Sequence, residues 1–192
     1  MDIITRSFQD SIAAKQSILN SPEKTAAIRL AAETLINALR SGHRVVWCGN
    51  GGSAADAQHL AAELSGRFYY DRPPLNSEAL HCNTSYLTAV ANDYGYDLIY
   101  SRMIDGACTK GDVLVGISTS GNSTNICNAF RKARELGVTT IAMTGETGGK
   151  MKELADILLN VPSTDTPRIQ ECHILIGHII CEIVEANIFP KN

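Results

Sequence analysis

The chain has 192 residues, a length that favours one domain built around one hydrophobic core. Hydrophobic residues make up 44% of the sequence, charged residues make up 19%, and the formal net charge is only -3. This charge balance gives no indication of a basic surface that would bind nucleic acid. We therefore expect anionic ligands to be held by local groups.

Neither export nor membrane insertion is indicated by the apolar segments. The N-terminal stretch MDIITRSFQDSIAAKQ mixes acidic and basic residues and has no apolar core of signal-peptide length. Polar residues, including Glu171 and Glu182, interrupt the most apolar segment, which lies near the C-terminus. No uninterrupted apolar run therefore approaches the roughly 18 residues that a membrane span needs. We expect a cytoplasmic protein without a membrane partner.

Two helices are predicted before any strand, over residues 3–19 and 23–41. The second begins in a recognisable way, because Ser21-Pro22-Glu23 supplies a capping side chain, a first-turn proline and an acid. From residue 44 onward, short β-rich apolar runs alternate with helical stretches. The runs predicted as strands are 44–48, 78–82, 112–118, 139–144 and 157–161. This alternation predicts a five-stranded parallel sheet flanked by helices.

The last segment, residues 167–188, predicts a long amphipathic helix rich in Ile. It is too apolar to lie bare on a monomer surface, so we expect it to pack between subunits. No Pro/Ser-rich linker divides the chain. We therefore expect a single α/β domain over 1–192, with residues 1–42 as an N-terminal helical extension and 43–192 as the α/β core.

The cysteines form no C-x-x-C pair, which argues against a thiolate metal site. Most lie among apolar residues, where a free Cys behaves as a small hydrophobe. We predict that all six are reduced core residues: Cys48, Cys82, Cys108, Cys127, Cys172 and Cys181.

Two polar loops follow predicted strands, Gly49-Asn50-Gly51-Gly52-Ser53 and Ser118-Thr119-Ser120-Gly121-Asn122-Ser123. In doubly wound sheets, ligands bind at the carboxyl ends of the strands, where helix N-termini present free N–H groups. Hydroxyls and amides of the second loop could surround a phosphate without Lys or Arg. The first loop lacks the spacing of a dinucleotide loop and the Gly-Lys-Ser/Thr of a P-loop. A glycine turn with a Ser or Asn cap is also common without any ligand.

His59 and Glu63 are four residues apart in a predicted helix, about 40° apart on one face, so both can reach one ligand. Gln170 and His178 lie eight apart, about 12 Å along the last helix. Together these side chains suit Zn²⁺ or a similar ion, or a proton-transfer pair for carbonyl isomerisation. The purely structural alternatives are that His59 and Glu63 form a surface ion pair and that His178 is a core histidine.

Five blocks carry a more specific signal, in this order: "CGNGGSAADAQHLAAELSGRF", "VANDYGY", "GDVLVGISTSGNSTN", "MTGETGGKM" and "RIQECHILIGHIICEI". They resemble the blocks of the phosphoheptose isomerases, or sedoheptulose 7-phosphate isomerases, of the sugar isomerase (SIS) domain superfamily. The resemblance runs from about residue 44 to the C-terminus. It implies a five-stranded SIS fold, a homotetramer whose sites borrow residues across subunits, and conversion of sedoheptulose 7-phosphate into D-glycero-D-manno-heptose 7-phosphate for lipopolysaccharide or capsule heptoses.

The resemblance also implies roles for residues at matching positions. Glu63 and His178 resemble the acid/base pair, and one Zn²⁺ per subunit would be held by His59, Glu63, Gln170 and His178. The substrate-binding residues it implies are Asn50, Gly51, Gly52, Ser53, Glu63, Asn92, Asp93, Ser118, Thr119, Ser120, Ser123 and Gln170.

Two other functions stay open on the same residues. A close relative of the family, a bacterial replication-initiation protein that binds the DnaA initiator, shares the G-N-G loop but lacks the acid corresponding to Glu63. The "NIFP" sequence near the C-terminus resembles that protein. The alternatives are a non-catalytic SIS module that binds DnaA and a sugar-phosphate sensor.

Overall fold

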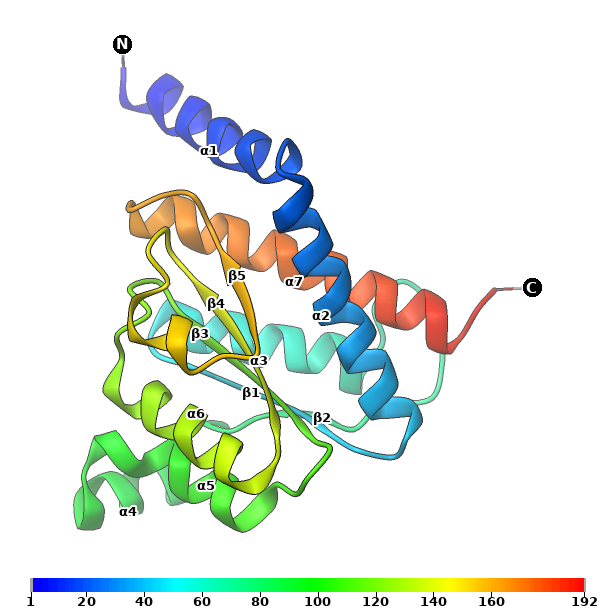
Figure 1. The fold of residues 1–192 in the computed structure, drawn as a ribbon, viewed down its shortest axis with the longest axis vertical. Helices are drawn as coiled ribbons and strands as arrows, with labels where there is room; N and C mark the ends of the chain where they lie inside the picture. The colour runs from blue at the N-terminus through cyan, green and yellow to red at the C-terminus, as the bar shows by residue number, and fades with distance from the viewer. Residues whose placement is uncertain (1, 192) are drawn as a thin grey trace.

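Five parallel strands form one sheet in the computed structural model, which describes residues 2–191 (Figure 1). The strands are β1 (Val45–Gly49), β2 (Ser77–Ala79), β3 (Val113–Ser118), β4 (Thr139–Thr144) and β5 (Ile157–Asn160), in the order β2-β1-β3-β4-β5. The predicted α/β class and parallel sheet are confirmed. The second strand is shorter than predicted, because the chain turns after Leu80, where the Cys82 amide bonds the Ala79 carbonyl.

Helices cover both faces of the sheet because its strands are apolar on both sides. One face, which includes Val45 and Trp47, packs against α2 (Pro22–Arg40), α3 (Gly52–Ser65) and α7 (Thr166–Ile188). The other, which includes Val46 and Cys48, packs against α4 (Thr84–Tyr94), α5 (Ile99–Ala107) and α6 (Thr124–Leu136). The remaining helical segments are α1 (Ile3–Leu19), η1 (Tyr96–Leu98) and η2 (Gly149–Glu153).

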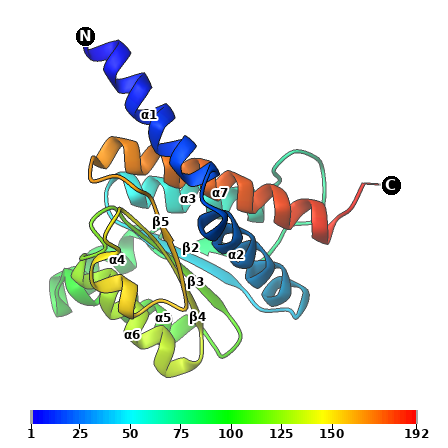
Figure 2. The ribbon, with the colours of Figure 1, turned by 45° about the horizontal axis from the view of Figure 1, so that its top comes forward.

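The strand order reverses between β1 and β3, which creates a crevice at their carboxyl ends. After β1 the chain enters α3 on one face, and after β3 it enters α6 on the other (Figure 2). Because Gly49 pairs with Ile117 in the sheet, both polar loops begin at the same level. The topology therefore places these two loops side by side at one edge.

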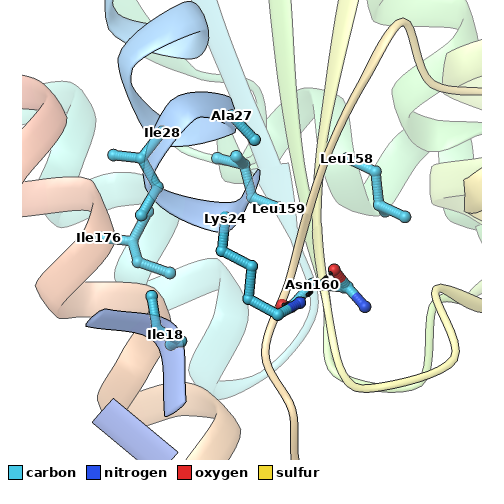
Figure 3. Close-up of a pocket in the computed structure, with 8 residues that line it drawn as sticks. All are labelled: Ile18, Lys24, Ala27, Ile28, Leu158, Leu159, Asn160 and Ile176. Atoms are coloured by element: carbon cyan, nitrogen blue, oxygen red, sulfur yellow. Dashed lines mark hydrogen bonds between the residues drawn. The ribbon is translucent and has the colours of Figure 1, made fainter. Parts of the chain in front are cut away.

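A separate small cavity between α2, β5 and α7 results from the packing of these elements. It has a volume of about 10 Å³, room for about one water, and its walls are mostly apolar (Figure 3). Lys24 donates from Nζ to the carbonyl and the side-chain oxygen of Asn160, at 2.9 and 2.8 Å. This cation ties α2 to the end of the edge strand β5.

Helix α1 extends away from the rest of the fold and carries apolar side chains in solvent (Figures 1 and 2). Ile4, Phe8 and Ile12 are 70%, 68% and 62% exposed. Leu175 and Ile179 of α7 are also exposed, and they share with Ile12 a groove of about 360 Å³. The expectation that α7 is too apolar for a bare surface therefore extends to α1.

One of the cysteine predictions is wrong. Cys82 is exposed, whereas Cys48, Cys108, Cys127, Cys172 and Cys181 are buried. Cys82 lies in the turn that ends β2 early, so its side chain leaves the core. None of the six is in a disulfide.

Among residues 2–191, no helix combines the length and the apolar character needed to cross a bilayer.

His173 joins α7 to the end of β4. The ring is fully buried, and Nε2–H donates to the Thr144 carbonyl at 3.0 Å, while Nδ1 has no partner. Burial lowers the pKa of His173 to about 4, although the hydrogen bond to Thr144 acts in the opposite direction. The folded protein therefore holds this imidazole neutral.

We predict that the free energy of unfolding falls less between pH 7 and pH 4 in His173→Gln than in the wild-type protein. Between the unfolded pKa near 6.5 and the folded pKa near 4, the unfolded wild type binds the additional proton, so falling pH lowers its free energy of unfolding by about 3 kcal/mol in total. Urea unfolding of both proteins from pH 7 to pH 4 measures this. Parallel stability curves would contradict the prediction, and His43→Gln controls for the loss of any histidine.

Candidate active site

His59, Glu63 and His178 form a cluster whose ligand atoms all lie within 4.8 Å of one another. Nε2 of His59 lies 2.9 Å from Nε2 of His178 and 3.1 Å from Oε1 of Glu63. The first two residues share one face of α3, as the four-residue spacing predicts, and the third comes from α7. The side chain of His59 is 49% exposed, so the cluster is open to solvent or to a neighbouring chain.

Close packing of α3 against α7 brings the cluster together. Gly177, next to His178, lies so near Leu60 that an added Cβ would be 2.3 Å from Leu60 Cδ1. One turn further along α7, the Cys181 thiol lies 3.9 Å from the Leu60 carbonyl. A larger residue at position 177 would require the buried Leu60 side chain to shift, or the two helices to move apart.

The atoms of this cluster suit a cation. Nε2 of His59 carries at most one proton, so it cannot donate to Glu63 while accepting a hydrogen bond from His178. A divalent ion would satisfy two imidazole nitrogens and a carboxylate oxygen at once, and this donor set is typical of zinc sites. The described residues therefore fit the predicted metal.

Gln170, in α7, contacts the start of α3 and does not lie within this three-residue cluster. An added Cβ on Gly52 would be 2.5 Å from Gln170 Nε2, so the amide rests directly on the first residue of α3. His59 follows Gly52 by seven residues, about 10 Å along the helix. Gln170 thus joins the glycine loop to α7, and His178 joins the middle of α3 to α7.

The first polar loop is shaped by glycine and by a partly buried pair of amides. Gly51 precedes α3 with φ 57°, a conformation that favours glycine, and no side chain caps this helix. Asn50 and Asn125 exchange two hydrogen bonds, both 2.9 Å. The hydroxyl of Tyr96 donates to Asn50 Oδ1 at 3.2 Å. The first-turn amide of the buried Ser53 bonds the Asn50 carbonyl at 3.1 Å, so the start of α3 is held by backbone contacts and not by a side-chain cap.

Asn125 and Tyr96 were not predicted as site residues. Asn125 is 2% exposed, in the first turn of α6, and its partner is 75 residues away in the sequence. A polar residue in an apolar helix start, directly after a predicted anion loop, is the signal that could have identified it. Tyr96 lies in "VANDYGY", one of the blocks already quoted, but its spacing to Asn50 has no local pattern.

The second polar loop packs backbone to backbone against residues 145–149. An added Cβ on Gly121, where φ is 65°, would be 2.2 Å from the Gly148 carbonyl. The Gly145 amide donates to the Thr119 carbonyl at 2.9 Å. Thr119 and Ser120 line a pocket of about 190 Å³ that also contains residues from the start of α7. Ser118 and Ser123 hydrogen bond each other at 2.9 Å.

Helix α6 follows this loop without a side-chain cap. By contrast, side chains cap α1, α2 and α4, from Asp2, Ser21 and Asn83. Free first-turn amides and serine hydroxyls at one helix start can hold a phosphate. Lack of a side-chain cap is shared with α5 and α7, so it is the polar loops before α3 and α6 that make these two helix starts the expected anion sites.

Asn92 and Asp93 lie exposed at the end of α4, where Nδ2 of the first donates to Oδ1 of the second at 2.8 Å. In the part of the chain that the structure describes, no hydrogen bond joins them to either polar loop. Their helix leads to Tyr96, which contacts Asn50. Their substrate-binding role stays a prediction.

The chain as a whole is similar to known proteins of one family. A family model for the SIS domain matches residues 7–145. The chain is 56% identical to a phosphoheptose isomerase of Mycobacterium bovis over 185 residues, which are 96% of this chain and 94% of that protein.

Two solved structures are similar over nearly the whole chain. A phosphoheptose isomerase from Francisella tularensis has a TM-score of 0.90 and 38% identity, covering 94% of this chain and 95% of that one. Phosphoheptose isomerase GmhA from Neisseria gonorrhoeae has a TM-score of 0.88 and 44% identity, covering 95% and 97%. The resemblance found in the sequence blocks is confirmed.

We predict that Asn125→Leu lowers the free energy of unfolding by about 1–3 kcal/mol, because it leaves the Nδ2 group of Asn50 without an acceptor. Denaturant unfolding measures this change. Asn37→Leu, at an exposed position of α2 where no hydrogen bond to the side chain is found among the described residues, is the control and should change the free energy of unfolding by about 0.5 kcal/mol or less. Equal losses in the two variants would show that the amide pair has no special importance.

Proposed function

The chain belongs to the SIS domain family and, within it, to the phosphoheptose isomerases, and from this we propose that it converts sedoheptulose 7-phosphate into D-glycero-D-manno-heptose 7-phosphate. The observation that carries the proposal is the convergence of Glu63 with two histidines where α3 packs against α7. Such a product would serve the heptoses of lipopolysaccharide, capsule or related glycans. Nothing in the fold or in the comparisons favours a module that binds DnaA.

Glu63 and His178 act, in this proposal, as the acid/base pair that moves a proton between C1 and C2 through an enediol or enediolate. A carboxylate has two oxygens, and it is Oε1 of Glu63 that lies 3.1 Å from His59, which leaves Oε2 for proton transfer. The hydroxyls and backbone amides of residues 118–123 would hold the phosphate, and residues 50–53 and Gln170 would hold the sugar. In this proposal the phosphate end of the substrate lies at residues 118–123, and the sugar end lies between α3 and α7.

We propose one Zn²⁺ per subunit at His59, Glu63 and His178, with Gln170 as the fourth ligand. Three of these side chains already converge, and Gln170 contacts the start of the same helix. When bound, the ion supplies Lewis-acid polarisation of the substrate's carbonyl and hydroxyl oxygens. Metal analysis of the purified protein tests this assignment, and a metal-free protein with full turnover would refute it.

We also propose a homotetramer and a cytoplasmic location. The exposed apolar side chains of α1 and α7 support assembly, because they flank a groove of about 360 Å³ that water would otherwise fill. Sedimentation velocity measures the assembly, and a stable monomer would refute it. Cell fractionation tests the location.

Turnover tests the function directly. With zinc present, the purified protein should convert sedoheptulose 7-phosphate to the aldose, and Glu63→Gln should abolish this while substrate binding and assembly are retained. The reason is that the amide removes a proton acceptor with little change in volume. Product formation is followed by chromatography, and binding by calorimetry. Wild-type protein without turnover would refute the function, and an unfolded Glu63→Gln would assign that residue a structural role.

Ser120→Ala should mainly raise KM, by about tenfold, because it removes one hydroxyl from the loop proposed to hold the phosphate. Steady-state kinetics with sedoheptulose 7-phosphate measures this. Ser11→Ala, on α1 and away from the crevice, is a matched control. An unchanged KM would contradict the phosphate assignment.

A further inference from the structure

A buried ion pair beside the three-residue cluster joins Arg72, in the segment between α3 and β2, to Glu185 of α7. Nε of Arg72 lies 3.0 Å from Oε1 of Glu185, and the two side chains are 2% and 1% exposed. Taking both charges out of water is costly, and a buried ion pair is weak evidence for stability by itself. Its other contacts indicate what it does.

Arg72 binds the end of α3 through its remaining N–H groups. Nη2 donates to the Glu63 carbonyl at 2.7 Å, and Nη1 donates to the carbonyls of Leu64 and Gly66 at 2.7 and 3.0 Å. Carbonyls in the last turn of a helix lack partners within the helix, and a cation there is favourable. Arg72 therefore fixes the turn from which the Glu63 side chain projects.

Glu185 binds the same segment from α7. It follows His178 by seven residues, two helical turns, so both side chains lie on nearly the same face. Oε1 accepts from the Phe68 amide at 2.8 Å, and Oε2 accepts from the Tyr69 amide at 2.7 Å. The Phe68 ring lies 5.7 Å from the ring of His178.

The surroundings of Glu185 keep it ionised. Burial acts to raise its pKa, but the Tyr69 and Phe68 amides and the Arg72 guanidinium together hold the pKa below its ordinary value. The planar guanidinium donates in several directions at once, so one side chain links the end of α3, a loop and α7.

We propose that Arg72 and Glu185 are positioning residues that hold Glu63 and the Phe68 ring in register with His178. They touch neither substrate nor metal, and they act through the backbone of α3 and through α7. The proposal rests on the proposed isomerase function for its kinetic consequences. Its effect on the metal site is independent of turnover.

Arg72→Lys is the informative substitution, because it keeps a charge opposite Glu185 but cannot bond the carboxylate and the α3 carbonyls together. We expect kcat to fall about 10-fold to 100-fold, since small misplacements of reacting groups are costly. KM should change by less than about threefold, because the phosphate loop lies on other elements. Zn²⁺ affinity, measured by competition with a chromogenic chelator, should fall about tenfold.

Glu185→Gln is the second variant. Arg72→Met should lower kcat and Zn²⁺ affinity more than Arg72→Lys does. Glu78→Gln, in the exposed Arg44–Glu78 pair, is the matched control and should leave kcat and Zn²⁺ affinity unchanged. Circular dichroism and Tm report whether each protein is folded at the assay temperature.

The outcomes separate the inference from the function. Folded Arg72→Lys with wild-type kcat and Zn²⁺ affinity would overturn the positioning role, and so would unfolding of both single variants, which would assign the pair to stability alone. Wild-type protein that binds Zn²⁺ without turnover would refute the isomerase function alone, because the chelator comparison still tests positioning. Wild-type protein with neither property would overturn both.

Discussion

Gly177 allows α7 to lie directly against α3, and the candidate site depends on that contact. An added Cβ at this position would be 2.3 Å from a Leu60 methyl carbon. The approach places His178 next to His59 and Glu63, which no single helix could achieve. The same two helices meet again at the buried Arg72–Glu185 pair. Packing and polar contacts thus specify one relative position for the two halves of the cluster.

Much of the fold follows from local patterns, and the strands and the helices before them could be predicted because periodicity and capping are local signals. The pairing of His59 with Glu63 is also local, since both lie on one turn of α3. The convergence of His178 is not, because it requires the tertiary packing of α7. Arg72 was missed because it lies in an irregular segment where no period indicates burial. The burial of Cys82 was predicted wrongly because β2 ends in a turn.

Buried polar groups mark the junctions between elements in this fold. His173 joins α7 to β4, Arg72 joins α3 to the following loop, and Asn125 joins α6 to the loop after β1. Each has specific hydrogen bonds, which offset the cost of removing it from water. Apolar side chains could fill the same volumes, but without hydrogen bonds they would not fix the relative orientation of the elements. The polar junctions therefore restrict how the elements sit relative to the crevice.

The backbone contact between Gly121 and Gly148 has a consequence for ligand binding. It joins the loop after β3 to the loop after β4, and the bond from the Gly145 amide to the Thr119 carbonyl reinforces the connection. A loop held in this way is preorganised, so an incoming anion would lose little free energy in ordering it. The loop of residues 118–123, which we propose holds the phosphate, is therefore fixed by these contacts before any ligand binds. The end formed by α3 and α7 owes its shape to side-chain packing, and adaptation to different sugars would be concentrated there.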